Sequence, residues 1–220
     1  MKITDQNYAV PEGDTHFGKW VEQHQRLDFD QSALGQYLPL FPEKGVLINV
    51  GANIGCYAYA FLKKASEVIC FEPNPPVFEC LRHNLGNFSN TKLFNEAISD
   101  SIRPFEMGEC DGNFGAVPIV HKNNSATKTN YIDNFNFKSI DFMLIDAEGS
   151  ELNILKGAVK SINKFKPIIV MEINTHLLER LKATKEDIFN FLENQKYSYR
   201  NIYKGRPLTG PQDDIICTPL

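Results

Sequence analysis

Long hydrophobic runs are missing from this sequence. None of its 220 residues belongs to an uninterrupted apolar stretch of the roughly 18 residues that a membrane-spanning helix needs. The opening stretch, MKITDQNYAVPEGD, also lacks the apolar core of a secretion signal. We therefore expect a cytoplasmic protein that has no membrane partner.

Paired cysteines and excess positive charge are missing too. The five cysteines are odd in number and widely spaced and include no C-x-x-C pair, which argues against a disulfide framework and against a zinc site. Free cysteine is often buried, so we interpret them as small core residues. The formal net charge of −4 gives no general attraction for a phosphate backbone, so we expect no nucleic-acid partner. The sequence indicates no oligomeric state.

Short apolar runs and amphipathic stretches alternate from residue 45 onward. The runs are rich in branched and aromatic residues, as buried strands are. We expect strands at 46–50, 67–72, 92–98, 140–146 and 167–173, and helices at 54–65, 75–86, 149–164 and 176–195. The repeated order of strand, helix and strand predicts an α/β fold with a doubly wound, mostly parallel sheet covered on both faces.

The remaining segments differ from this pattern. Residues 197–203 and 215–220 predict two late strands that form an antiparallel pair. Residues 100–135 are rich in glycine and asparagine and predict an irregular lid or substrate loop. Residues 1–44 are expected to form a cap or a substrate segment, and residues 45–220 to form the main domain.

The glycine turn GANIG, residues 51–55, follows the first expected strand and opens the first expected helix. Ligands of open parallel sheets bind at such strand ends. Gly51 can adopt backbone angles closed to other residues, and we expect Gly55 to let the helix pack close to the strand. A dinucleotide site usually has G-x-G-x-x-G, whereas Asn53 stands where the middle glycine would be. A nicotinamide-dependent oxidoreductase is therefore a less favoured alternative.

Glu72 ends the second expected strand, in the stretch VICFEPNP. A carboxylate at this strand end can accept hydrogen bonds from both hydroxyls of a ribose, and the amide of Asn74 could meet an adenine edge. The alternative is an ordinary surface carboxylate that flanks a helix. Together with the glycine turn, Glu72 favours an adenosine-type ligand.

Several stretches resemble the FkbM family of S-adenosylmethionine-dependent methyltransferases. They occur in order and with ordinary spacing, and they are VLINVGANIG, VICFEPNPPVFECLRHNL, NEAIS, IDFMLIDAEGSELNILKGA and KPIIVMEIN. The resemblance covers about residues 45–205. It implies a Rossmann-like methyltransferase domain with a seven-stranded sheet, in which the late strands are the antiparallel pair, and S-adenosylmethionine as the cofactor.

The resemblance also implies a cofactor site at the ends of the strands. The methionine part of the cofactor would lie along the glycine turn, the ribose against Glu72, and the adenine beside Asn74 and the end of the third strand. The implied cofactor-binding residues are Asn49, Gly51, Ala52, Asn53, Gly55, Glu72, Asn74, Asn95, Glu96, Ala97 and Asp146.

The chain departs from the family at two positions. Asn49 replaces a usual aspartate that helps to orient the cationic amino end of the cofactor, and Leu144 replaces a usual lysine. An amide keeps the hydrogen-bonding shape of the carboxylate but loses its charge. Cofactor affinity could therefore be weaker than is usual for the family.

The stretch IDAEGSEL places three acids at the end of the fourth expected strand and the start of the next helix. Methyl transfer depends mostly on positioning, and a base that deprotonates a hydroxyl acceptor adds about a hundredfold to ten-thousandfold in rate. Asp146 is the first catalytic candidate and Glu148 the second. Glu151 is more readily explained as an acid that stabilises the start of a helix.

Further polar residues are candidates near the acceptor. Glu172 ends the fifth expected strand and is expected either to contact substrate or to bond to a neighbouring loop, because a buried carboxylate needs a partner. Asn113 lies in GNFG, which is either a turn that closes over the site or an ordinary glycine loop. His176 and His121 are candidate bases, although lone histidines are usually surface residues. The acids could ligate magnesium, but no spacing requires a metal and we expect none.

We therefore expect an S-adenosylmethionine-dependent O-methyltransferase that acts on a hydroxyl of a small molecule, a saccharide or a secondary metabolite. The acceptor class comes from the resemblance alone. The main alternative is a module that binds the cofactor without methyl transfer, which the departure at Asn49 keeps open.

Overall fold

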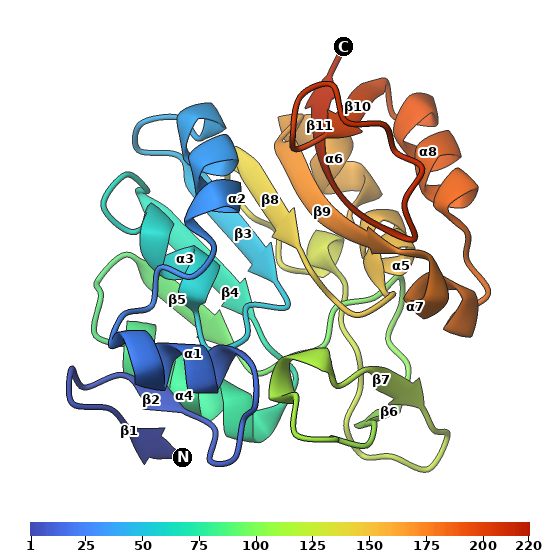
Figure 1. Cartoon of the computed structure of the whole chain (residues 1–220). Coiled ribbons are helices and arrows are strands. Elements are labelled where there is room, and N and C mark those ends of the chain that lie inside the picture. Colours follow the sequence, from blue (N-terminus) through green and yellow to red (C-terminus); the bar gives the residue numbers. More distant parts are fainter.

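The computed structural model describes all 220 residues and contains one seven-stranded sheet (Figure 1). Its strands, in spatial order, are β10 (Tyr197–Asn201), β11 (Gln212–Pro219), β9 (Ile168–Asn174), β8 (Phe142–Ile145), β3 (Val46–Val50), β4 (Glu67–Phe71) and β5 (Thr91–Phe94). Strands β5, β4, β3, β8 and β9 are parallel, and β11 is antiparallel to both of its neighbours. The predicted doubly wound sheet with a late antiparallel pair is confirmed.

Strand order reverses between β3 and β8. The chain builds outward from β3 through β4 to β5, and then returns to the other side of β3 to form β8 and β9. Loops that leave the sheet in opposite directions open a crevice beyond the carboxyl ends of such strands. The glycine turn follows β3 and the Asp146 segment follows β8, so both lie at this crevice.

Helices cover both faces of the sheet (Figure 1). Because side chains alternate along a strand, neighbouring residues of β3 enter different cores: Ile48 enters the first and Leu47 the second. The first core joins the sheet to α5 (Glu151–Lys156), α6 (Val159–Phe165), α7 (Thr175–Arg180) and α8 (Lys185–Asn194). The second joins it to α2 (Gln31–Tyr37), α3 (Cys56–Phe61) and α4 (Pro75–Leu85).

Tertiary contacts divide or shorten the expected helices. The helix expected at 149–164 is divided into α5 and α6 at Gly157, where an added Cβ would lie 2.0 Å from the carbonyl oxygen of Ser99. The helix expected at 176–195 is divided into α7 and α8, and the side chain of Thr184 caps α8. α3 is shorter than the expected 54–65, whereas α4 matches its predicted extent.

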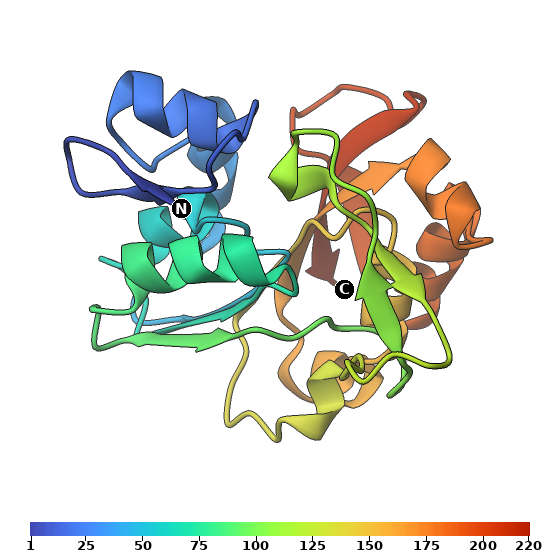
Figure 2. The same ribbon diagram turned by 90° about the horizontal axis from the view of Figure 1, so that it is seen from below.

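Residues 100–135 are more regular than expected. β6 (Phe105–Met107) pairs antiparallel with β7 (Ile119–His121), and this segment also contains the short 3-10 helices η2 (Phe114–Ala116) and η3 (Ile132–Asn134). Pairing of the two strands satisfies backbone groups that an irregular loop would leave to solvent. We call residues 105–121 the lid; Figure 2 shows this green segment opposite the blue N-terminal segment.

Residues 1–44 contact both α4 and the lid. They form β1 (Lys2–Ile3), β2 (Ala9–Val10), α1 (Phe17–His24), α2 and η1 (Leu38–Leu40). The backbone N–H of Ala9 donates to Oδ1 of Asn84 (2.7 Å), and Nδ2 of Asn84 donates back to the carbonyl of Ala9 (3.0 Å). The N–H of Thr15 donates to the carbonyl of Gly112 (2.8 Å). The N-terminal segment therefore packs beside the crevice.

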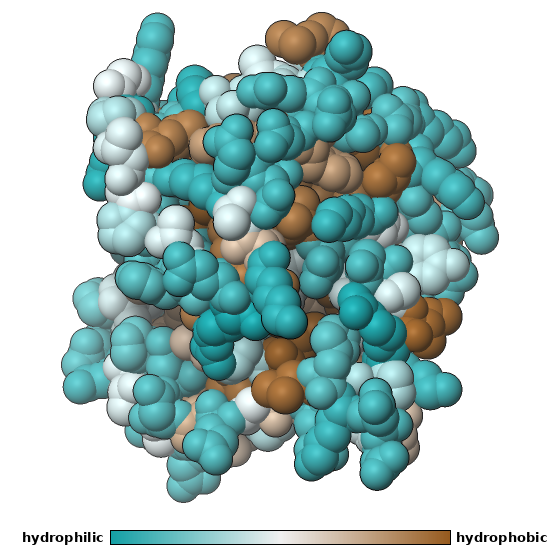
Figure 3. All heavy atoms as spheres, turned by 90° about the vertical axis from the view of Figure 1, so that its right-hand side faces the viewer, coloured by the Kyte–Doolittle hydropathy of each residue, from teal (hydrophilic) through white to brown (hydrophobic).

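The surface over α7 and α8 is mostly hydrophilic, and its hydrophobic residues are scattered (Figure 3). The large hydrophobic residues exposed on the molecule lie in separate parts of the chain: Met1, Ile3, Phe88, Ile102, Val120 and Leu220. None of the helices has the length and apolar character that crossing a membrane requires.

Candidate active site

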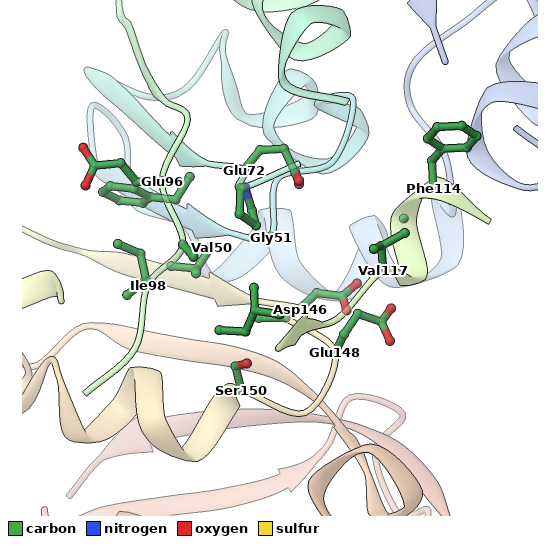
Figure 4. Close-up of a pocket in the computed structure, with 16 residues that line it drawn as sticks. Val50, Gly51, Glu72, Glu96, Ile98, Phe114, Val117, Asp146, Glu148 and Ser150 are labelled. Carbon is green, nitrogen blue, oxygen red and sulfur yellow. The ribbon is translucent and has the colours of Figure 1, made fainter. Parts of the chain in front are cut away.

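A cleft lies at the carboxyl edge of the sheet, where the ends of β3, β4 and β8 meet the lid (Figure 4). In the close-up, Val117 of the lid lies across from Gly51 and Asp146, whereas the ring of Phe114 points away from them. We use "the cleft" for the space lined by Val50, Gly51, Phe71, Glu72, Pro73, Glu96, Ala97, Ile98, Phe114, Gly115, Val117, Ile119, Asp146, Ala147, Glu148 and Ser150, and by the adjoining Phe17, Ala52, Asn53, Cys56, Tyr57 and Asn113.

The glycine turn joins three strand ends at this cleft. The N–H groups of Gly51 and Ala52 both donate to the carbonyl of Phe71 at the end of β4 (3.0 Å each). Gly51 has φ +78°, and an added Cβ would lie 1.7 Å from the carbonyl oxygen of Asp146 at the end of β8. Only glycine satisfies both conditions, since other residues rarely adopt this angle and all carry a Cβ. The turn thus requires Gly51 for backbone packing as well as for an open cleft.

Glu72 is held rigidly at the end of β4. Its side chain accepts hydrogen bonds from the N–H groups of Asn53 and Asn74 (2.9 Å each), and the residue is only 7% exposed. Burial raises the pKa of Glu72 to about 7, and the two N–H donors counteract part of that rise. Each carboxylate oxygen can accept more than one hydrogen bond, so Glu72 can also accept from ligand hydroxyls in the cleft.

Asn49 lies two residues before the turn and is 1% exposed. Neither its Nδ2 nor its Oδ1 has a hydrogen-bond partner. A buried amide without partners costs free energy, so this position is suited to a water or ligand group that bridges to it. Asn49 is not among the residues that line the cleft, so of the two polar residues only Glu72 faces a cleft ligand directly.

Of the residues predicted on the adenine side, some line the cleft and others hold neighbouring backbone in place. Ala97 and Glu96 line the cleft, and Glu96 accepts from Nδ2 of Asn130 (2.8 Å). Nδ2 of Asn95 instead donates to the carbonyls of Glu72 (2.8 Å) and Pro73 (3.1 Å), so Asn95 fixes the position of the β4 end. Asn74 is buried at the N-cap of α4 and is not among the residues that line the cleft.

Gly55 packs against a helix and not, as expected, against the strand. An added Cβ would lie 2.8 Å from Cδ1 of Leu85 and 3.0 Å from Cδ1 of Leu81, both in α4. Gly55 has φ +97° and is the N-cap of α3. It therefore sets the spacing between α3 and α4, whereas Ala52 and Asn53 line the cleft directly.

The acids after β8 have two different environments. Glu151 is 1% exposed, and its Oε1 accepts from the N–H groups of Ala147 (3.0 Å) and Gly149 (3.2 Å), so it stabilises the loop before α5. The side chains of Asp146 and Glu148 line the cleft close to each other (Figure 4), and neither makes a hydrogen bond within the chain. Asp146 and Glu148 therefore present both carboxylate oxygens to the cleft, whereas Glu151 has one buried oxygen, Oε2, without a partner.

Burial and mutual repulsion raise the pKa values of these acids. Burial is the largest cause for Asp146, whose pKa is raised well above its usual value, and the charges of Glu172, Glu148 and Glu151 add to it. Burial and the charge of Glu172 raise the pKa of Glu148 to about 7. A carboxyl group whose pKa approaches neutrality can accept a proton from a hydroxyl more readily than an ordinary one.

Glu172 lies on the neighbouring strand β9, where its Oε1 accepts from Nε2 of Gln212 on β11. The expected structural bond is therefore made to a neighbouring strand and not to a loop, and Glu172 also lines a smaller cavity next to Asp146. The sequence reasoning missed three other residues of that cavity, Asp214, Tyr37 and Tyr57. The period-two pattern of DDIIC could have placed Asp214 on the same sheet face as Ile216.

The lid closes one side of the cleft through the GNFG turn. Phe114 lines the cleft, and an added Cβ on Gly115 would lie 2.4 Å from Nδ2 of Asn53, so the lid directly contacts the glycine turn. Asn113 lines the cleft, and its Oδ1 accepts from the N–H of Gly115 (3.2 Å). Phe17 of the N-terminal segment completes this wall, a contribution that sequence reasoning did not predict.

Histidines are absent from the lining of the cleft. His176 is exposed in the first turn of α7, and His121 is exposed at the end of the lid. The titratable side chains that line the cleft are consequently carboxylates, among them Asp146 and Glu148 after β8. In addition, no three His, Cys, Asp or Glu side chains of the chain have the arrangement of a metal site.

Residues 49–199 match the methyltransferase FkbM domain. Two relatives are similar to this chain. The 2-O-methyltransferase NoeI of Sinorhizobium fredii is 22% identical over 159 residues, which are 61% of this chain and 65% of that protein. The hexuronic acid methyltransferase AglP of Haloferax volcanii is 27% identical over 175 residues, which are 71% of each protein. The chain thus covers slightly less than two thirds of the first relative's length.

Solved structures share the fold. Methyltransferase FkbM from Methylobacillus flagellatus superposes with a TM-score of 0.55 at 18% identity, over 81% of this chain and 44% of that chain. A Streptococcus mutans protein solved in complex with SAH superposes with a TM-score of 0.55 at 11% identity, over 85% of this chain and 96% of that chain. These likenesses confirm the predicted Rossmann-like methyltransferase fold. With the domain match across more than half of its length, this chain belongs to the methyltransferase FkbM family.

Proposed function

We propose that this protein transfers a methyl group from S-adenosylmethionine to a hydroxyl of a saccharide. The observation that carries the proposal is the placement of Glu72 and Asp146 on opposite sides of one cleft, next to the glycine turn. Glu72 supplies an acceptor for ribose hydroxyls, and Asp146 supplies a free carboxylate beside the position of the transferred group.

Residues of β3, β4 and the loop after β5 would hold the cofactor. Glu72 would accept hydrogen bonds from the ribose hydroxyls, and Ala97 and Ile98 would pack against the adenine. The amide of Asn49, which has no partner within the chain, would help to orient the amino end of the cofactor through the turn. When bound, the cofactor supplies a methyl group on a positively charged sulfur. The lid residue Val117 would exclude water from that methyl group, because it lies across from Gly51 and Asp146.

Asp146 would act on the acceptor. Its carboxylate makes no internal hydrogen bond, so it is free to accept the hydrogen of the acceptor hydroxyl and to take its proton as the new bond forms. Glu148 would orient the acceptor from the same side. Their raised pKa values suit this role, because a base works best when its pKa lies near the working pH.

The saccharide acceptor rests on the relatives. One of them is named a 2-O-methyltransferase and the other a hexuronic acid methyltransferase. Phe17 and Tyr57 provide aromatic surface in the part of the cleft next to Asp146, which suits the apolar face of a sugar ring. The N-terminal segment that carries Phe17 would then form part of the acceptor site.

Calorimetric titration with S-adenosylmethionine, S-adenosylhomocysteine and NAD tests the proposal. We expect binding of the first two ligands and no NAD signal, followed by methyl transfer to a saccharide hydroxyl in a mass-spectrometric assay. Absence of binding by either adenosyl ligand would refute the cofactor assignment. Binding without transfer to any hydroxyl acceptor would favour the second candidate, a binding module, which the unpartnered Asn49 amide supports.

A further inference from the structure

A second cavity lies beside the cleft, between the sheet and the helices α2 and α3. Its polar lining consists of the side chains of Asp146, Glu172, Asp214, Tyr37 and Tyr57. Asp146 and Tyr57 line both this cavity and the cleft, so the two spaces share a wall. An acceptor whose hydroxyl lies at Asp146 can therefore place a second polar group in this cavity.

Three carboxylates of this cavity form a row across neighbouring strands. Asp214 of β11 is the register partner of Glu172 of β9, and Asp146 directly follows Ile145, the partner of Met171. Since neighbouring strands lie about 4.8 Å apart, the carboxylates are spread along one edge of the sheet. Such a row can surround an organic group and does not resemble the compact oxygen shell of a metal ion.

The opposite wall contains a largely buried tyrosine whose hydroxyl has no partner within the chain. Tyr37 is only 4% exposed, yet its hydroxyl makes no hydrogen bond within the chain, although the residue lines the cavity. Buried hydroxyls are normally hydrogen-bonded. The unpartnered Tyr37 hydroxyl is thus an observation independent of the acids that points to a polar ligand group in the cavity.

The cavity contains no positive charge of its own. No lysine or arginine lines it, and Glu172 has only the neutral amide of Gln212 as a partner. Arg206 acts on Asp214 from outside the lining, while Asp30 adds a further negative charge. A carboxylate or phosphate on the acceptor would be repelled here, whereas an ammonium group would be attracted.

We propose that this cavity is an acceptor subsite for a protonated amine, and that the preferred acceptor is an amino sugar. The inference rests on the proposed function, because it takes the reacting hydroxyl to lie at Asp146. The ammonium would donate to Asp214 and Glu172, and the hydroxyl of Tyr37 would contact the same end of the sugar. An acceptor with a carboxylate at that position would be excluded.

Binding of three monosaccharides to the protein saturated with S-adenosylhomocysteine tests this inference. Glucosamine, glucose and glucuronate differ in the charge of one substituent, and we expect glucosamine to bind about tenfold more tightly than glucose, with glucuronate the weakest. Burial raises the pKa of Asp214 to about 6, so at pH about 6, where the sugar amine is already protonated, ammonium binding should release protons from this carboxyl. Titrations in buffers of different ionisation enthalpy would detect that release for glucosamine and none for glucose.

Two variants test whether the preference for glucosamine over glucose arises in this cavity. Asp214→Asn should reduce the preference for glucosamine over glucose about tenfold, whereas the matched control Glu179→Gln, an exposed acid of α7, should retain it. If Asp214→Asn does not fold, Tyr37→Phe serves instead and should weaken glucosamine binding severalfold. Equal binding of glucosamine and glucose, no glucosamine binding, or a preference that survives both variants would overturn the inference.

The experiment also separates this inference from the proposed function. If S-adenosylhomocysteine does not bind, the proposed function fails, and titration of the ligand-free protein with glucosamine still reports on the cavity. If S-adenosylhomocysteine binds and glucosamine shows no advantage over glucose, only the amine subsite is refuted. A stronger response to Mg²⁺ than to glucosamine would also refute it, in favour of a metal.

Discussion

The two sides of the crevice use buried carboxylates in different ways. On the β4 side, both backbone N–H groups that face Glu72 donate to it at 2.9 Å. On the side of β8, β9 and β11, the side chains of Asp146 and Asp214 have no hydrogen-bond partner within the chain. Glu72 thus has hydrogen-bond donors before a ligand arrives, whereas Asp146 and Asp214 have none.

This difference indicates how each side would bind a ligand. Hydrogen bonds from backbone N–H groups stabilise the ionised form of Glu72 and hold its orientation, which suits repeated binding of one cofactor. Crowded acids without partners gain stability when a proton or a cation arrives, which suits an acceptor that contributes its own donors. Substitutions on each side test this contrast.

Replacement of the proposed base, Asp146, should have the largest effect. Asp146→Asn should lower turnover by about a hundredfold to ten-thousandfold, because an amide cannot take a proton, while affinity for S-adenosylhomocysteine is retained. Thermal stability should not fall, since the change removes a buried carboxyl that repels its neighbours. Turnover measured by mass spectrometry and binding measured by calorimetry check both parts. Glu148→Gln should lose less activity; a fully active Asp146→Asn protein would place the base elsewhere.

A change at the contact between the two sides should cost stability. Gly51→Ala should lower the free energy of unfolding by about 3 kcal/mol or more, because φ is +78° and the new Cβ would overlap the carbonyl oxygen of Asp146. Denaturant unfolding of the ligand-free protein measures this loss. Gly35→Ala is a matched control, since nothing lies within 4 Å of a Cβ added in α2. Equal stability of both variants would contradict the packing role of Gly51.

Removal of the partnered carboxylate should weaken cofactor binding. Glu72→Ala should reduce affinity for S-adenosylmethionine by about 1.5 to 3 kcal/mol, the scale of hydrogen bonds to a charged group. Calorimetry measures the loss, and Glu72→Gln, which keeps the shape of the side chain, should lose less. Unchanged affinity in Glu72→Ala would remove the ribose assignment and, with it, the contrast between the two sides.

The buried acids of both sides should make stability depend on pH, since burial also raises the pKa of Glu72 to about 7. Burial raises the pKa of Asp214 to about 6 and of Glu148 to about 7, so the native state holds protons that the unfolded state has released. The free energy of unfolding should therefore fall as pH rises from about 4 to about 7. Asp214→Asn should reduce that fall by up to about 2 kcal/mol. Denaturant unfolding across this range measures the slope, and a slope of opposite sign would contradict the raised pKa values.

Strand ends were predictable because they combine two local signals. A short apolar run locates a buried strand, and the first polar or glycine residue after it must lie at the edge of the sheet. In this way Gly51, Glu72 and Asp146 were all placed correctly at the cleft, and Glu172 beside it. Contacts between elements were less accessible: the break at Gly157 depends on a carbonyl from Ser99, 58 residues earlier in the chain.

The second cavity could not be predicted for the same reason. Asp214 reaches it only because β11 inserts between β9 and β10, and Tyr37 only because α2 packs on the sheet face of Leu144 and Val170. Both are long-range contacts. The apolar run predicts a last strand from residue 215, which puts Asp214 in a loop, whereas β11 begins at Gln212.

Local sequence was enough to specify the alternating elements, the glycine turn and the acids that follow the strands, because apolar periodicity and backbone requirements act over a few neighbouring residues. Which of these acids have hydrogen-bond partners depends on the tertiary structure. Glu72 and Glu151 meet backbone N–H groups, whereas Asp146 and Asp214 meet other acids. Charge and hydrogen bonding depend on what lies opposite a side chain in space, and the fold alone sets those neighbours.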